Sequence, residues 1–178
     1  MTRSETPPFF ILTGPPGSGK TTLLQALATD FTAIPEAARR VLAEQRRTGG
    51  RATGEQNAAH FVARMLETMT IDYDGAKGLT LFDRGLPDLL AFCAHYRLSD
   101  TSVRVAVHSR PYRKRVFFLP AWEEIYHADD ERRLDFVGAE AFGALTRAGF
   151  ISAGYEMVDV PKTSVQARAG FIRAHIES

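Results

Sequence analysis

The sequence has a single cysteine, no long apolar run and almost no net charge. Cys93 is the only cysteine among 178 residues, so an internal disulfide is excluded. No stretch approaches the roughly 18 to 20 apolar residues that cross a bilayer, and we expect no membrane span. The net charge of +1 argues against a globally basic protein that binds nucleic acid. Because Cys93 lies in the apolar stretch LLAFCAHY, we expect a buried, inert thiol.

Other signatures are missing as well. The five histidines form no HxH or HExxH spacing, which leaves no dedicated transition-metal site. Asn57 is the only asparagine, so the Asn-Lys-x-Asp motif that reads guanine is absent. The polar opening MTRSETPP is not followed by a signal-peptide core, and we expect a cytoplasmic protein. Residues 1–8 are expected to form a flexible N-terminus, and residues 9–178 a single domain.

Short apolar runs alternate with helical patterns along the chain. Most runs are continuous, which is typical of strands buried on both faces of a parallel sheet. The expected strands are residues 9–13, 31–34, 79–83, 115–119 and 155–160. The expected helices are residues 20–29, 36–48, 55–73, a segment after Pro87, 100–108, 130–148 and 163–176. This order predicts an α/β fold with three layers (α/β/α) around a five-stranded parallel sheet, with ligands bound beyond the carboxyl ends of the strands.

The stretch GPPGSGKT, residues 14–21, fits the P-loop pattern GxxxxGK[ST] and has a strand before it and a helix after it. Glycines let backbone N–H groups turn toward phosphate oxygens. Lys20 is placed to bind the β and γ phosphates, and the Thr21 hydroxyl to ligate Mg²⁺. We therefore expect ATP and Mg²⁺ as cofactors. The residues expected to bind the nucleotide in this loop are Gly14, Pro15, Pro16, Gly17, Ser18, Gly19, Lys20, Thr21 and Thr22.

Asp83 ends the third expected strand, in the stretch LTLFDRG. P-loop proteins keep a carboxylate at this place, facing the magnesium and the reacting phosphate, so Asp83 is a candidate metal ligand and catalytic residue. A helix-capping aspartate is the alternative. A hydrolytic motor would usually carry a second carboxylate next, but Arg84 stands there. This favours phosphoryl transfer to a small molecule, with Arg84 among the residues that bind it.

The stretch IPEAARR follows the second expected strand and offers Glu36, Arg39 and Arg40 to an acceptor. Glu36 is a candidate for orienting or deprotonating the acceptor hydroxyl. An equally favoured interpretation is a first-turn glutamate that pairs with Arg39 and Arg40 at i,i+3 and i,i+4.

A lid is expected at about residues 121–135. There, Arg132 and Arg133 would neutralise charge in the transition state, or form an exposed cluster of ion pairs with neighbouring acids. A helix in this region would be capped by Asp129 or Asp130 and would end at Gly149. After the fifth strand, Arg168 is expected beside the nucleotide base, or as a solvated arginine.

Several stretches together resemble the NadR-like AAA-type P-loop family, named for a bacterial nicotinamide riboside kinase domain: GPPGSGKTTLL, PEAARR, DRGLPD, VFFLP and VPKTSVQAR. The similarity covers residues 9–176. It implies a nucleoside-kinase-like fold that binds ATP and Mg²⁺ through Gly17, Gly19, Lys20 and Thr21. It also implies that Glu36 and Asp83 lie near the reacting centre, under a short arginine lid.

These features predict an ATP- and Mg²⁺-dependent phosphotransferase for a small hydroxylated acceptor that resembles a nucleoside or riboside. The alternative is a nucleotide-binding module, like an ATPase or GTPase, that engages an anionic partner through the basic residues at 39–51 and 110–115. A polynucleotide kinase is less favoured, because the chain is nearly neutral and lacks interleaved aromatic residues.

Overall fold

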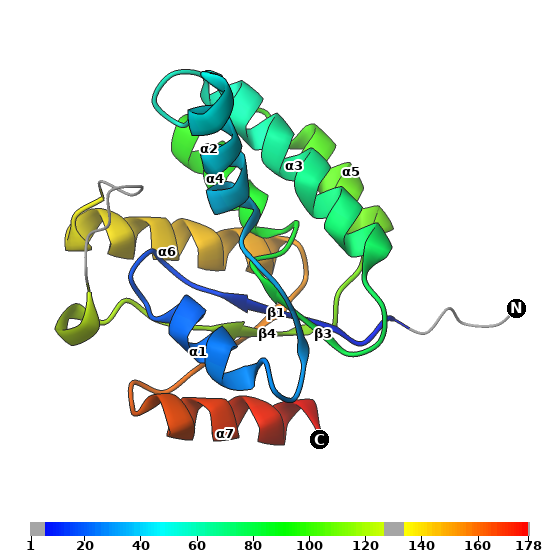
Figure 1. Ribbon diagram of the computed structural model, residues 1–178, viewed down its shortest axis with the longest axis vertical. Coiled ribbons are helices and arrows are strands. Elements are labelled where there is room, and N and C mark those ends of the chain that lie inside the picture. The colour runs from blue at the N-terminus through cyan, green and yellow to red at the C-terminus, as the bar shows by residue number, and fades with distance from the viewer. Residues whose placement is uncertain (1–5, 127–133, 178) are drawn as a thin grey trace, which may run out of the picture.

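The computed structural model describes residues 6–126 and 134–177 (Figure 1). At its centre lies a five-stranded sheet in the order β2-β3-β1-β4-β5, and every pair of neighbours is parallel. The strands are β1 (Phe9–Thr13), β2 (Thr32–Ile34), β3 (Thr80–Asp83), β4 (Arg115–Phe118) and β5 (Glu156–Asp159). All five predicted strands are found, with bounds that differ by at most one residue at either end. The predicted fold class is confirmed.

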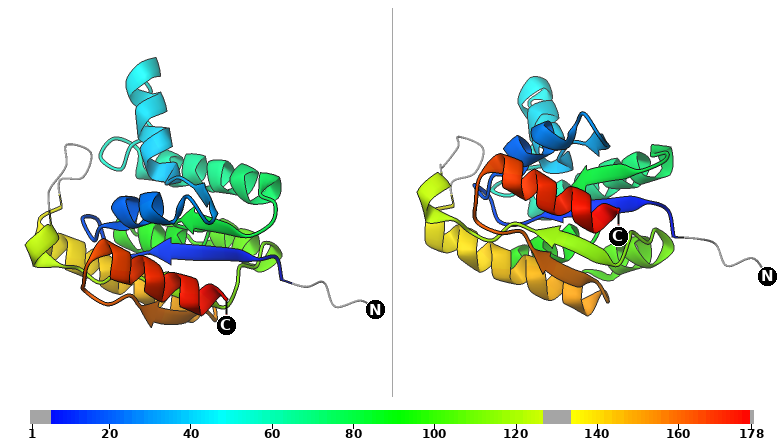
Figure 2. Two further views of the ribbon diagram at one scale, coloured as in Figure 1. Left: turned by 60° about the horizontal axis from the view of Figure 1, so that its bottom comes forward. Right: turned by 90° about the horizontal axis from the view of Figure 1, so that it is seen from below.

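Helices cover both faces of this sheet (Figure 2). They are α1 (Lys20–Leu27), α2 (Ala37–Thr48), α3 (Ala58–Gly75), α4 (Asp88–Tyr96), α5 (Thr101–Ser109), α6 (Phe136–Ser152) and α7 (Val165–Ile176), with a 3₁₀ turn, η1, at Glu123–Ile125. Side chains alternate along a strand, so Phe9 and Ile11 of β1 join one core while Phe10 and Leu12 join the other. Helices α1 and α7 pack on the second core, and α2 to α6 on the first.

Burial differs between central and edge strands. Strands β1 and β3 are buried along their whole length, and β4 along all but its first residue, whereas β2 and β5 form the edges and are partly exposed. The prediction of strands buried on both faces therefore holds for the centre of the sheet. Cys93 is buried on α4, as predicted, and burial raises the pKa of its thiol. The described part of the chain contains no helix with the length and apolar character needed to cross a membrane.

Helix α6 differs from its prediction at both ends. It begins after Asp135, whose side chain accepts a hydrogen bond from the backbone N–H of Gly138 at 2.8 Å. The caps expected at Asp129 and Asp130 lie outside the described residues, as do residues 1–5 of the expected flexible N-terminus. Gly149 does not end the helix. It lies inside α6, because its missing Cβ admits Leu90 of α4, whose Cβ is 3.0 Å from the place that a Cβ would occupy.

Helix α6 has one buried face. Ala139, Phe142, Thr146 and Phe150 are buried and follow helical spacing, while Val137 is 71% exposed. The face that α6 presents to α4 therefore carries Phe142, whose ring meets Phe92 of α4 edge to face.

Candidate active site

The loop between β1 and α1 forms a narrow cradle. Gly14 has φ +146°, and a Cβ at this position would lie 2.2 Å from the carbonyl oxygen of Leu119. Only glycine fits such a backbone at such a distance. A Cβ at Gly17 would lie 2.6 Å from the ring of Tyr126. Helix α1 then starts at Lys20, and its N-terminal amides and dipole favour an anion in the loop.

Lys20 is held inside this loop. Its Nζ donates hydrogen bonds to the carbonyl oxygens of Gly14 (3.1 Å) and Pro15 (2.9 Å), and the side chain is only 4% exposed. A buried ammonium group held by carbonyl dipoles is positioned to meet phosphate oxygens that enter the cradle. Thr21 and Thr22 follow on the first turn of α1 and are exposed.

Asp83 is brought to the cradle by the sheet. In the register of β1 and β3 it lies opposite Leu12, two residues before Gly14, and its side chain is buried. Mg²⁺ in nucleotide enzymes uses one or two protein oxygens, with phosphates and water completing its shell. The Thr21 hydroxyl and the Asp83 carboxylate fit this requirement. Among the described residues, no group of three or more metal-binding side chains occurs elsewhere.

A buried ion-pair network joins β2, β3 and α4 beside the cradle. Nε of Arg84 donates to Oε1 of Glu36 at 3.0 Å, and Nη1 donates to Oδ1 of Asp88 at 2.9 Å. All three side chains are almost fully buried. Burial alone would lower the pKa of Arg84, but the carboxylates of Glu36, Asp88 and Asp83 outweigh it and raise the pKa, so the guanidinium stays cationic.

The backbone and Asp88 hold Arg84 in an unusual position. Arg84 has φ +69°, which is rare for a residue with a side chain and marks a constrained site. Asp88 accepts further hydrogen bonds from the hydroxyl of Thr13 and from the backbone N–H of Gly85. Thr13 directly precedes Gly14. The network therefore ties the start of the cradle to the turn that carries Arg84.

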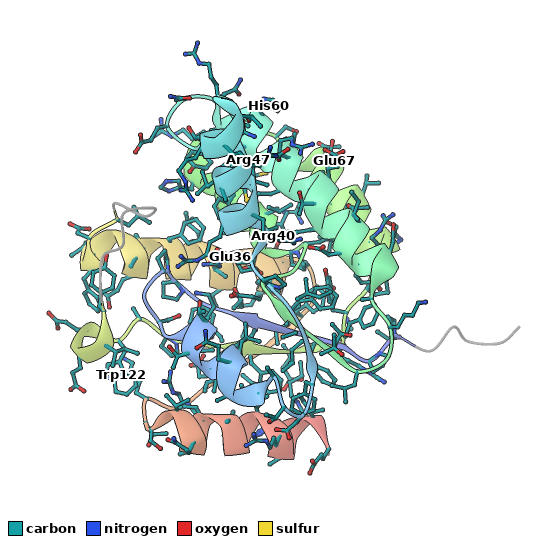
Figure 3. The ribbon with its side chains drawn as sticks, in the orientation of Figure 1. Glu36, Arg40, Arg47, His60, Glu67 and Trp122 are labelled. Atoms are coloured by element: carbon teal, nitrogen blue, oxygen red, sulfur yellow. The ribbon has the colours of Figure 1, made fainter. Side chains whose placement is uncertain are left out.

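The two arginines of the IPEAARR stretch have different partners; Figure 3 labels one of them, Arg40, and the nearby Glu36. Nε of Arg39 lies 3.5 Å from Oε2 of Glu36, the i,i+3 contact that the sequence suggested. Arg40 instead pairs with Asp72 of α3, with 3.1 Å between Nη1 and Oδ1. Glu36 thus lies between Arg39 and Arg84, whereas Arg40 joins α2 to α3.

Arg168 and Trp122 lie at the other side of the cradle. Arg168 is on the first turn of α7 and is 5% exposed, and its Nη1 would be 3.1 Å from a Cβ placed on Gly19. Its guanidinium lies over the Trp122 ring, 5.5 Å from the centroid. Its buried Nε donates to no described residue. The lid arginines Arg132 and Arg133 lie outside the described residues.

A cavity of about 650 Å³ opens next to the cradle, between α2, α3, α4 and α6. Pro16, Glu36 and Arg84 form the end that meets the phosphate loop. The walls combine aromatic and polar side chains: Phe61, Phe92, Tyr96, Phe142, Gln45, Arg46, Glu55, Gln56 and His95. The Arg84 guanidinium lies 5.8 Å from the Phe142 centroid, so the ion-pair network borders the aromatic wall. We call this space the acceptor cavity.

The loop between α2 and α3 forms the lip of the acceptor cavity. Gly54 in this loop touches Tyr96 of α4 so closely that a Cβ at Gly54 would lie 2.0 Å from the Tyr96 hydroxyl. The backbone N–H of Ala52 donates to Oε1 of Gln45, which anchors the loop on α2. The lip is therefore in contact with both α2 and α4. The sequence showed this stretch only as a break between helices.

A family model described as an AAA domain matches residues 9–168. The chain belongs to this AAA-domain family. The match includes the phosphate loop, the Asp83–Asp88 turn and most of the acceptor cavity's wall. No curated protein matches the sequence.

Solved structures place this AAA domain among P-loop kinase folds. Shikimate kinase from Acinetobacter baumannii in complex with shikimate has a TM-score of 0.65 and 18% identity, and the alignment covers 97% of this chain and 94% of that one. Deoxyadenosine kinase from M. mycoides has a TM-score of 0.67 and 12% identity, with 95% and 98% covered. Thymidylate kinase from Ehrlichia chaffeensis has a TM-score of 0.61 and 14% identity, with 96% and 98% covered. The chain therefore combines membership of the AAA-domain family with the fold of these solved kinases.

Sequence reasoning missed part of the site in this AAA domain. Asp88 and Thr13 were not selected, although DRGLPD was recognised as a unit, because their contact joins positions that are 75 residues apart. The aromatic wall from Phe92, Tyr96 and Phe142 was missed too, since periodicity marks these side chains only as apolar. One signal in the sequence could have identified Asp88. It is the i,i+4 spacing of the opposite charges Arg84 and Asp88 at the start of an apolar helix.

Proposed function

We propose that this protein is an ATP- and Mg²⁺-dependent phosphotransferase whose acceptor is a small hydroxylated molecule that resembles a nucleoside or riboside. The observation that carries the proposal is the acceptor cavity itself. It meets the phosphate loop at Pro16 and holds Glu36 at the same end. A hydroxyl presented there would lie between a carboxylate and the place where the γ phosphate is held.

The walls of the acceptor cavity support a ring-shaped acceptor. Phe92 and Phe142 meet edge to face at 4.9 Å between centroids, and Tyr96 and His95 continue this wall. Aromatic faces bind planar rings by stacking. Gln45, Gln56 and Glu55 supply donors and acceptors at the lip for ring substituents and sugar hydroxyls.

Each charged residue has a role in this proposal. Glu36 orients or deprotonates the acceptor hydroxyl, and Arg84 holds Glu36 in place. Lys20, with Arg132 and Arg133 of the lid, binds the transferring phosphate. Thr21 and Asp83 would hold the Mg²⁺, which would supply positive charge to the phosphates when ATP is bound. Arg168 supports the nucleotide next to Gly19, and Arg39 supports Glu36 from α2.

The test is release of ADP from ATP and Mg²⁺ with a panel of nucleosides, ribosides and aminoglycosides, alongside ATP binding measured by calorimetry. We expect one group of acceptors to raise ADP release well above the basal rate, and the Lys20→Ala variant to lose this activity. If ATP binds but no acceptor in the panel changes the rate, the phosphotransferase proposal fails. Phosphorylated product identified by mass spectrometry separates transfer from hydrolysis.

The alternative, a module that engages an anionic partner through its basic clusters, receives less support. Arg39 pairs with Glu36, Arg40 with Asp72, and Arg110 with both carboxylate oxygens of Asp74. These local ion pairs reduce the charge that either cluster offers to a large anion.

A further inference from the structure

A second cavity of about 440 Å³ lies at the opposite end of the sheet from the phosphate loop. Its wall includes Tyr112, which precedes β4, and Tyr155, which precedes β5. Both residues therefore stand at the amino ends of parallel strands, whereas the phosphate loop follows the carboxyl end of β1. This second cavity shares no lining residue with the acceptor cavity.

The second cavity combines an apolar floor with a cationic rim. Leu90, Val107 and Ala153 line the floor, and the cations Arg104 and Lys114 stand at the rim. Arg104 is already paired with Asp100. Lys114 donates from Nζ to the carbonyl oxygen of Gly154 at 3.0 Å, and no described carboxylate forms an ion pair with it. The charge of Lys114 is thus available to an anion at the mouth of an apolar space.

Two tyrosine hydroxyls in this wall have protons to donate. The Tyr155 hydroxyl accepts from the backbone N–H of Tyr112 at 3.3 Å, and the Tyr112 hydroxyl accepts from the backbone N–H of Leu86 at 3.3 Å. Within residues 6–126 and 134–177, neither hydroxyl donates a hydrogen bond in return. Burial raises the pKa of both side chains, so both keep their protons at neutral pH. A hydrogen-bond acceptor in the cavity would satisfy Tyr155.

We propose that the second cavity is an effector site for a small molecule with an apolar ring and one anionic group. The ring fills the space over Leu90 and Val107, and the anion meets Lys114. This assignment gives a role to Lys114, the one basic residue of the stretch 110–115 that lines the second cavity. An inorganic anion would gain no binding energy from the apolar floor, and a neutral ring would gain none from the charge of Lys114. Both parts of the ligand are therefore required.

Tyr112 connects the second cavity to the active site. Its ring lies 5.2 Å from the Phe82 ring, and its Cζ would be 3.2 Å from a Cβ at Gly85. Together with the hydrogen bond from Leu86, these contacts place Tyr112 directly beneath the turn that holds Arg84. A ligand that presses on Tyr112 acts on the residue network that positions Glu36. Binding in the second cavity is therefore expected to change the affinity for nucleotide, and nucleotide binding is expected to change the affinity of the second cavity for its ligand.

The first test uses 2-naphthoate as the probe, with its neutral amide, 2-naphthamide, and with acetate as controls. In ¹H–¹⁵N spectra of the full chain, 2-naphthoate is expected to shift the amides of Val107, Lys114 and Tyr155 in a saturable manner. The amide and acetate are expected to bind at least about tenfold more weakly. Equal affinity for the neutral amide, or shifts centred on His95 and Phe61 of the acceptor cavity, would overturn the proposal.

Two charge variants refine this test. Lys114→Gln is expected to weaken 2-naphthoate binding about fivefold or more, since it removes the anion's partner while leaving the apolar floor intact. Lys77→Gln removes an exposed lysine that lies outside both cavities and should leave affinity unchanged. Both positions are exposed, so folding should survive, and identical affinities of the two variants would refute the role of Lys114.

The effector role is tested separately through linkage. The dissociation constant of ATP, measured by calorimetry with and without saturating 2-naphthoate, should differ about threefold or more in either direction. ATP binding that is the same in both conditions would overturn the coupling through Tyr112. Neither measurement requires an acceptor, so the outcome does not depend on whether the phosphotransferase proposal succeeds.

Discussion

Arg84 and Glu36 form a buried ion pair, 3.0 Å from Nε to Oε1, although 48 residues separate them in the sequence. The pair joins the carboxyl ends of two neighbouring strands, at the mouth of the acceptor cavity. It decides the position of the carboxylate that we assign to the acceptor hydroxyl. This contact bears on both the stability of the fold and the proposed chemistry of Glu36, and the two effects can be tested separately.

Replacing Arg84 should destabilise the fold strongly. Arg84→Met keeps the length of the side chain but leaves Asp88 buried without its cation and Glu36 with only the more distant Arg39, a loss of about 3 to 5 kcal/mol in the free energy of unfolding. Urea denaturation measures it. Arg104→Met, which breaks the exposed pair with Asp100, is the matched control and should cost less than about 1 kcal/mol. Equal losses would show that the Arg84 network is not a structural unit.

The carboxylate of Glu36 should matter to turnover and not to nucleotide binding. Glu36→Gln keeps a hydrogen-bond acceptor for Arg84 but cannot take a proton, so kcat for the acceptor identified in the panel should fall by about 10² to 10⁴. The dissociation constant of ATP should stay within about twofold of the unmodified protein. A variant that keeps full kcat would assign proton removal to another group.

The cradle should tolerate no side chain at its first glycine. Gly14→Ala would place a Cβ 2.2 Å from the Leu119 carbonyl oxygen on a backbone with φ +146°. We therefore expect the free energy of unfolding to fall by more than about 2 kcal/mol. We also expect the variant to lose its affinity for ATP. Gly78→Ala is the control. Gly78 also has positive φ, at +65°, but has nothing within 4 Å, and its replacement should cost only about 1 kcal/mol. Similar losses would mean that backbone strain alone explains Gly14.

Arg168 should contribute to nucleotide affinity. Its buried guanidinium lies against Gly19 and over the Trp122 ring, so Arg168→Leu should weaken ATP binding about tenfold in a calorimetric titration. Arg173→Leu, on the same helix but paired with Asp30 at the surface, should leave ATP affinity unchanged. If Arg168→Leu binds ATP normally, the guanidinium serves only to pack α7 against Trp122.

Stability should depend on pH through the pair of Asp74 and Arg110. The hydrogen bonds from Arg110 lower the pKa of Asp74 below its unfolded value of 3.8. The pair therefore stabilises the fold above that pH and is lost as pH falls through the folded pKa. Asp74→Asn should lower Tm at neutral pH, and the difference should vanish in acid. Glu140 is exposed and forms no ion pair with a described residue. The Tm difference caused by Glu140→Gln should therefore not show this dependence on pH.

The sequence predicted the fold and the cradle because both depend on short, local signals. FFILT followed by GPPGSGKT requires a buried strand, a turn rich in glycine and a helix in that order. Asp83 could be placed because parallel strands end together at one edge. The role of each of these residues in chemistry remains a prediction.

The remaining features depend on contacts between distant segments. Arg40 could pair equally well with Glu36 on its own helix or with an acid on another, and only the packing of α2 on α3 selects Asp72. Gly149 satisfied the pattern for a helix end, but close packing on Leu90 keeps it inside α6. Sequence periodicity describes one element at a time, so it could not have identified either contact.

The contact between Gly54 and Tyr96 couples the lip of the acceptor cavity to α4. A Cβ at Gly54 would lie 2.0 Å from the Tyr96 hydroxyl, which is the far end of a side chain that can turn aside. A side chain at position 54 would therefore displace the Tyr96 ring, which lines the acceptor cavity, and change the shape of that space. Libraries that vary positions 54 and 96 together would sample more cavity shapes than libraries that vary the loop alone.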